Sequence, residues 1–157
     1  MPKPDPPQTS ICAFLTKVPY FAGLNAEIIQ ALAGVVSRQT YDTDACVLLK
    51  GEPCPGLGIV ESGTLKGVRL SLNGREQILK VFHPGHAFGT AGVFAEAPNP
   101  ISVIALESAT VCFIDQPSLF HLMERHPPLM QGVVRQLANR TQELVELAAD
   151  LSLRTVE

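Results

Sequence analysis

Cysteine and histidine are the residues of this chain best suited to metal binding, and their spacing argues against it. The four cysteines lie far apart, without a Cys-x-x-Cys pair: Cys12, Cys46, Cys54 and Cys112. Zinc and iron–sulfur sites normally take two ligands from a single turn, which such a pair supplies. We therefore expect buried, reduced thiols of the kind found in cytosolic proteins, and no metal site.

The histidines do not suggest an active site either. His83 and His86 flank a Pro-Gly turn as H-x-x-H, whereas metal enzymes on β-rich scaffolds commonly use H-x-H with a carboxylate and a further histidine. His121 and His126 fall on and at the end of a predicted helix, where a surface or helix-dipole role is expected. The chain has no G-x-S-x-G turn. We predict no catalytic residues and no enzyme.

Composition sets the class of protein. The 157 residues are 46% hydrophobic and 17% charged, which is typical of one folded domain. A net charge of −3 gives no bulk attraction to nucleic acid or acidic membranes. No apolar run reaches the roughly 18 residues of a membrane span, and the first ten residues do not form a signal peptide. These features predict a cytoplasmic protein that makes no membrane contact.

Three segments with different sequence patterns precede the C-terminal segment of the chain. Residues 1–10 are proline-rich and predict a flexible arm. Residues 11–36 predict two short helices, the second N-capped by Asn25. The next stretch predicts a curved antiparallel sandwich, because short apolar runs alternate with turn residues. Its expected strands are 46–49, 57–60, 64–72, 75–83, 101–106 and 110–114. Asn73-Gly74 predicts a two-residue type I′ hairpin turn.

The last segment predicts a long helix. Pro117 suits the start of a short helix, which Pro127-Pro128 would stop or restart, and residues 129–157 contain no proline. Apolar residues recur there at heptad spacing, which predicts a parallel coiled coil between two protomers. The alternative is a helix packed on its own β-roll, and one helix can do both. The expected dimer interface consists of Val134, Leu137, Thr141, Leu144, Ala148 and Leu151.

This order of elements resembles the Crp/Fnr family, whose sensor domain has the cyclic-nucleotide-binding fold. The resemblance spans residues 14–157 and is carried by four turn segments in order: 51–53, 61–66, 73–76 and 84–89. It implies a mainly β fold with flanking helices, namely a cyclic-nucleotide-binding-like double-stranded β-helix (jelly roll) over residues 11–128, followed by a long dimerisation helix over residues 129–157. The closing LSLRTVE resembles the hinge before the family's helix-turn-helix domain, so DNA contact would come only through that further domain.

The segment from Phe88 to Val103 resembles the family's phosphate-binding cassette, but it departs from the family pattern at two positions. Relatives that bind cyclic nucleotides have a glutamate for the ribose hydroxyl and an arginine for the phosphate. Thr90 and Asn99 stand at these positions here, and there is no lysine or arginine between Lys80 and Arg125 to compensate. An unpaired phosphate in a half-buried pocket is costly. We therefore expect no tight cAMP or cGMP binding in the usual mode.

The sequence thus predicts the ligand-sensing and dimerisation domain of a Crp/Fnr-type regulator, with an unidentified small-molecule effector. The expected ligand contacts are Phe88, Gly89, Thr90, Ala91, Asn99, Pro100, Ile101, Ser102, Asn139, Arg140 and Thr141. The resemblance also leaves open a haem-based gas or redox sensor, with His83 or His86 as iron ligand. A third alternative is the regulatory domain of a channel or kinase.

Overall fold

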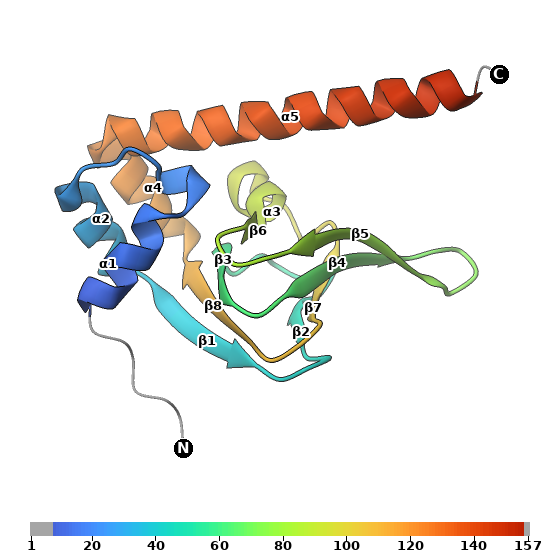
Figure 1. The fold of residues 1–157 in the computed structure, drawn as a ribbon, viewed down its shortest axis with the longest axis horizontal. Coiled ribbons are helices and arrows are strands. Elements are labelled where there is room, and N and C mark those ends of the chain that lie inside the picture. Colours follow the sequence, from blue (N-terminus) through green and yellow to red (C-terminus); the bar gives the residue numbers. More distant parts are fainter. Residues whose placement is uncertain (1–7, 156–157) are drawn as a thin grey trace.

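The structure is a computed structural model that describes residues 8–155 (Figure 1). Most of the expected N-terminal arm, residues 1–7, lies outside the described residues, as do residues 156–157 of the expected hinge. Helix α1 (Gln8–Thr16) begins within the predicted flexible arm, so residues 8–10 are helical. No helix of the described part is long and apolar enough to cross a membrane.

The N-terminal helices form a small cluster at one end of the β-roll. After α1 come a short 3-10 helix η1 (Pro19–Phe21) and helix α2 (Ala26–Ala33). The predicted N-cap of α2 is confirmed, because the Asn25 side chain accepts a 3.0 Å hydrogen bond from the Ile28 amide. Apolar residues of this cluster share one core with the neighbouring face of the roll, including Leu15, Phe21 and Leu32, each fully buried.

Two four-stranded antiparallel sheets make the roll, which confirms the expected jelly-roll fold. One has the order β1-β8-β3-β6 and the other β2-β7-β4-β5. The strands are β1 (Ser37–Tyr41), β2 (Cys46–Leu48), β3 (Leu57–Ser62), β4 (Leu65–Leu70), β5 (Glu76–Phe82), β6 (Ala87–Phe88), β7 (Ser102–Ala105) and β8 (Ala109–Ile114). The strand β1 was not predicted, because its SRQTY sequence is mostly polar and has no apolar run. It is held by pairing with the buried strand β8.

The hairpin between β4 and β5 occurs where it was predicted, but the turn type was wrong. Gly74 alone of the Asn73-Gly74 pair has a positive φ, of 76°, whereas a type I′ turn needs two. The Gly74 amide donates to the Ser71 carbonyl at 2.9 Å, and the Ser71 amide donates to the Arg75 carbonyl at 2.7 Å. This pattern is a tight turn closed by a left-handed glycine. The Ser71 hydroxyl stabilises it by accepting from the Arg75 amide.

One helix interrupts the roll and two follow it. Helix α3 (Thr90–Ala95) lies between strands, α4 (Gln116–Arg125) is capped by Asp115, and α5 (Pro127–Thr155) runs the length of the molecule (Figure 1). Helix α5 begins two residues before the expected start of the long helix. Its first turns pack on η1 and α4 through buried Leu129 and Val133, whereas every side chain of residues 138–153 is exposed.

Only one of the four cysteine thiols is buried. Cys112 lies inside β8, where burial raises the pKa of its thiol to about 12. Cys12 and Cys54 are half-buried and Cys46 is exposed, so the expectation of four buried thiols was wrong. Cys46 is exposed because it opens β2 at an outward position, and the sequence alternation alone did not show which face of that strand is covered.

Candidate functional site: a cavity between the roll and helix α5

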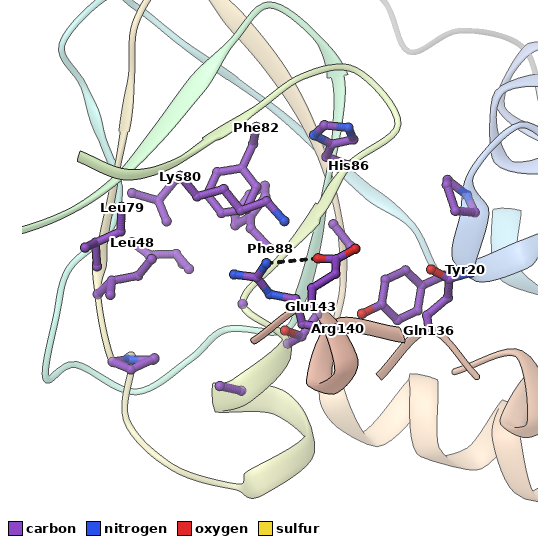
Figure 2. Close-up of a pocket in the computed structure, with 18 of the residues that line it drawn as sticks. Tyr20, Leu48, Leu79, Lys80, Phe82, His86, Phe88, Gln136, Arg140 and Glu143 are labelled. Atoms are coloured by element: carbon purple, nitrogen blue, oxygen red, sulfur yellow. Dashed lines mark hydrogen bonds and ion pairs between the residues drawn. The ribbon is translucent and has the colours of Figure 1, made fainter. Parts of the chain in front are cut away.

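A cavity of about 540 Å³ separates the β-roll from the middle of α5. Strands β5 and β6 and the turn between them form one wall, α3 and the loop after it form a second, and α5 closes the third (Figure 2). This size falls within the range of small-molecule sites. The lining residues are Pro19, Tyr20, Leu48, Leu79, Lys80, Phe82, Gly85, His86, Ala87, Phe88, Gly89, Thr90, Ala91, Asn99, Pro100, Ile101, Val103, Gln136, Asn139, Arg140, Glu143 and Leu144.

Glycines make room for the Phe88 ring and for the turn from β6 into α3 beside the cavity. Phe88 is buried over Gly58 of β3, where an added Cβ would overlap the ring. Gly89 has a φ of +76°, in the left-handed region, and starts α3 directly after β6. At Gly92, α3 packs on Cys54, whose Cβ would be 2.6 Å from an added Cβ. The sharp change from strand to helix in the cassette therefore depends on residues without side chains.

Helix α5 reaches the cavity because it docks closely on η1. At Gly132 an added Cβ would lie only 3.0 Å from the Tyr20 carbonyl oxygen, so the helix and the η1 backbone approach each other at a glycine. From this anchor the next two turns of α5 carry Gln136, Asn139 and Arg140 along the cavity. The helix is thus both a wall of the cavity and the element that extends away from the body.

Most of the predicted ligand contacts lie together in this cavity. Phe88, Gly89, Thr90, Ala91, Asn99, Pro100, Ile101, Asn139 and Arg140 all line it. Two predicted contacts do not. The Ser102 hydroxyl accepts a 3.0 Å hydrogen bond from the Lys50 amide, and the Thr141 hydroxyl donates to the Leu137 carbonyl of its own helix. Ser102 and Thr141 are each next in sequence to a lining residue and point elsewhere.

Asn99, at the position of the family's arginine, is 3% exposed. Its Nδ2 and its backbone make hydrogen bonds within the fold. Its Nδ2 donates to the Leu49 carbonyl at 3.0 Å, and its backbone pairs with Glu52 and Gly51 at 2.9 Å each. Its Oδ1 is different, since within the described part of the chain it is buried without a hydrogen-bond partner. A buried acceptor is costly when unpaired, so this atom suits a ligand or water donor.

The sequence argument about compensating cations was incomplete. The segment between Lys80 and Arg125 does lack lysine and arginine, but the fold brings Lys80 from β5 and Arg140 from α5 to the same cavity (Figure 2). Lys80 was missed, although its place two residues before the buried Phe82, on the same face of a strand, is a detectable sign. Its ammonium group lies 5.4 Å from the centroid of the Phe82 ring.

The two candidate haem ligands are poorly placed for iron. His83 does not line the cavity, while the Nδ1 of His86 accepts a 3.1 Å hydrogen bond from the His83 amide. A neutral His86 then carries its proton on Nε2, so neither nitrogen offers iron a lone pair in this conformation. Burial, followed by the charges of Lys80 and His83, lowers the pKa of His86 and favours this neutral form. The cavity lining includes no methionine or cysteine. These residues do not fit haem.

The fold and this cavity define a class of protein. A family model described as "Cyclic nucleotide-binding domain" matches residues 38–126, more than half of the sequence. The chain belongs to the cyclic nucleotide-binding domain family, and its relatives include Crp/Fnr-type regulators, as the resemblance predicted.

Three similar proteins show the range of that family. The chain is 26% identical over 137 residues to the CRP-like cAMP-activated global transcriptional regulator of Mycobacterium tuberculosis, covering 87% of this chain and 61% of that protein. It is 25% identical over 117 residues to the potassium channel SKOR of Arabidopsis thaliana, covering 74% and 14%. The crystal structure of Thermus thermophilus catabolite activator protein superposes with a TM-score of 0.77 at 26% identity, covering 85% and 62%. The chain thus spans less than two thirds of these relatives.

Proposed function

We propose that this chain is the effector-sensing and dimerisation part of a Crp/Fnr-type transcription regulator that acts in the cytoplasm. A small molecule occupies the cavity, two chains pair through α5, and ligand binding biases the crossing of the paired helices. DNA is contacted only through a helix-turn-helix domain that follows the hinge in the longer protein. The division into a roll over residues 11–128 and a dimerisation helix over residues 129–157 belongs to this proposal.

The observation that carries the proposal is that α5 forms a wall of the cavity and also carries exposed apolar side chains beyond it. Arg140 and Leu144 line the cavity, and Leu144 is also a predicted seam residue. Beyond the cavity, Leu151 remains 53% exposed, at a cost that pairing with a second α5 would remove. A ligand that contacts the first region of a helix can therefore alter the packing of the second.

The channel alternative keeps one supporting observation, whereas the solved kinase regulatory subunits are under 25% identical and show the same fold alone. The potassium channel SKOR is as similar in sequence as the bacterial regulators, though the match covers only 74% of this chain. The regulator matches extend further, to 87% of the chain. The longer match favours a regulator over a channel.

Binding of an uncharged aromatic probe tests whether the cavity takes small molecules. N-phenyl-1-naphthylamine fluoresces on entering apolar sites, and we expect it to bind the wild-type chain. Ala91→Trp should abolish the signal, because Ala91 lines the cavity and is exposed enough to accept a larger side chain. Ala95→Trp is the matched control, on the same helix but outside the lining. Equal probe binding by all three proteins would contradict a ligand site here.

A calorimetric titration with cAMP tests the effector class. We expect no heat up to millimolar nucleotide, because Thr90 and Asn99 replace both charged contacts of the usual mode. Losing one buried charge partner alone costs about 2–5 kcal/mol, which is tens to thousands of fold in affinity. Micromolar binding would show that cAMP is the effector after all and that other residues hold its phosphate.

A further inference from the structure

Two cations from separate elements face one another across the cavity. Lys80 extends from β5 and Arg140 from α5, and Figure 2 shows both side chains reaching toward the space beside Phe88. Burial, and next the charge of Arg140, lowers the pKa of Lys80, and Glu143 opposes this effect. The two cations are therefore close enough to repel each other in a partly desolvated space.

The protein supplies only part of the countercharge. Arg140 Nη1 contacts Glu143 Oε2 at 3.2 Å, a contact between two largely solvent-accessible side chains. Within the described residues, no carboxylate lies within 4.0 Å of Lys80. His86 and Tyr20 are the other titratable groups of the lining; the pKa of His86 is lowered and that of Tyr20 raised, each mainly by burial, which favours neutral side chains. Two positive charges and one negative charge leave the cavity one positive charge in excess.

The rest of the lining is chiefly apolar and aromatic. Phe82 and Phe88 pack with ring centroids 5.8 Å apart, and Leu48, Leu79 and Ile101 line the same cavity. At the opposite, cassette side, Thr90 and Asn99 are uncharged, and the buried Oδ1 of Asn99 lacks a donor. The positive charge of the cavity therefore lies on the β5 and α5 walls, and the two cassette positions are uncharged.

We propose that the effector is a small aromatic or aliphatic organic anion, whose single carboxylate or sulfonate group binds between Lys80 and Arg140. Its apolar body packs against Phe82 and Phe88. This inference rests on the proposed sensor function and specifies the ligand class for it. Because Lys80 belongs to the roll and Arg140 to α5, the anion links the two elements directly, and α5 responds to occupancy through that link.

A matched pair of probes isolates the charge. 1-Anilinonaphthalene-8-sulfonate is N-phenyl-1-naphthylamine with one added sulfonate, so the ratio of their dissociation constants reports recognition of the anion. We expect Lys80→Met and Arg140→Gln each to shift this ratio about tenfold against the anionic probe. Lys66→Met and Arg135→Gln are controls on β4 and α5 that remove a charge outside the cavity, and should leave the ratio unchanged.

The outcomes separate this inference from the proposed function. If Ala91→Trp blocks the uncharged probe but neither charge variant shifts the ratio, the cavity is a ligand site and the anion inference is overturned. The same holds if the sulfonate fails to bind the wild-type chain while the uncharged probe binds. If Ala91→Trp affects neither probe, the proposed function fails together with the inference. An equal shift in the control variants would assign the effect to general charge and overturn the specific roles of Lys80 and Arg140.

Discussion

Two adjacent alanines on α5 allow a sharp test of the dimer seam. Ala148 occupies a predicted seam position, whereas Ala149 is one residue round the helix, and both are exposed in the single chain. Neither alanine lines the cavity. Leu144, in contrast, lines the cavity and is also a predicted seam residue. Ala148→Asp therefore perturbs pairing without touching the ligand site, and Ala149→Asp introduces the same side chain into the same helix at an outward position.

The exposed seam sets the scale of the effect. Val134, Leu144 and Leu151 remain 59%, 48% and 53% exposed. Fully burying such a side chain contributes about 1.5–3 kcal/mol, so the remaining half gives about 1 kcal/mol each, or about 6 kcal/mol over both chains. This gain from apolar burial lies near the lower end of the roughly 4–15 kcal/mol cost of association. The dimer is therefore expected to be only marginally stable. Two aspartates facing across a parallel seam cost several kcal/mol; about 3 kcal/mol is about a hundredfold in dissociation constant.

Light scattering during gel filtration, over a series of loading concentrations, measures the change. We expect wild type and Ala149→Asp to have twice the 16.9 kDa mass of one chain, and Ala148→Asp to approach the mass of the monomer. Equal behaviour of the two variants would refute the heptad seam. A wild-type protein that is monomeric at every concentration would refute the dimer itself.

Three further predictions concern the fold around the site. Gly58→Ala should lower the free energy of unfolding by about 1–3 kcal/mol in denaturant titration, since its Cβ would meet the buried Phe88 ring; an unchanged midpoint would mean that the ring can move aside. Cys112 should resist iodoacetamide at pH 8 in the folded chain, because burial raises the pKa of its thiol to about 12; rapid labelling seen by mass spectrometry would contradict this. Asp115→Ala should cost about 1 kcal/mol by removing the cap on the Ser118 amide, while Asp115→Asn should retain the cap. The hydrogen bond from the Ser118 amide lowers the pKa of Asp115 below 3.8. The part of the cap's stabilisation that depends on the Asp115 charge is therefore present above that value and is lost as pH falls through the folded pKa. Thermal melts should show no such loss for Asp115→Asn.

The sequence predicted the succession of elements well where local patterns decide them. Asn25 caps α2 as expected because the cap bond is made within three residues. The turn predicted at Asn73-Gly74 occurs at the right place but has another type. The same dipeptide allows several turns, and the Ser71 hydroxyl and the strand register select among them. Strand β1 escaped notice because its stability comes from pairing with β8, a partner about 70 residues away.

The candidate site divides along the same line. The chain order and the cassette motif were enough to place Phe88, Thr90 and Asn99 at one cavity, since they lie within one short stretch of chain. The sequence also showed that the usual charged contacts are missing there. It could not show that Lys80 and Arg140 supply positive charge from elsewhere, because they are 60 positions apart and meet only when α5 docks on η1.

The sequence by itself determined the family, the order of the elements and the loss of the nucleotide clamp, because each depends on residue types at short spacing. The tertiary structure alone decided the charge of the cavity. It also decided that some residues next in sequence to the lining residues point away from the cavity. Ser102 and Thr141 point away because a backbone amide and a helix carbonyl, respectively, bind their hydroxyls. Electrostatic interaction depends on distance through space, and only the packing of α5 against the roll sets that distance.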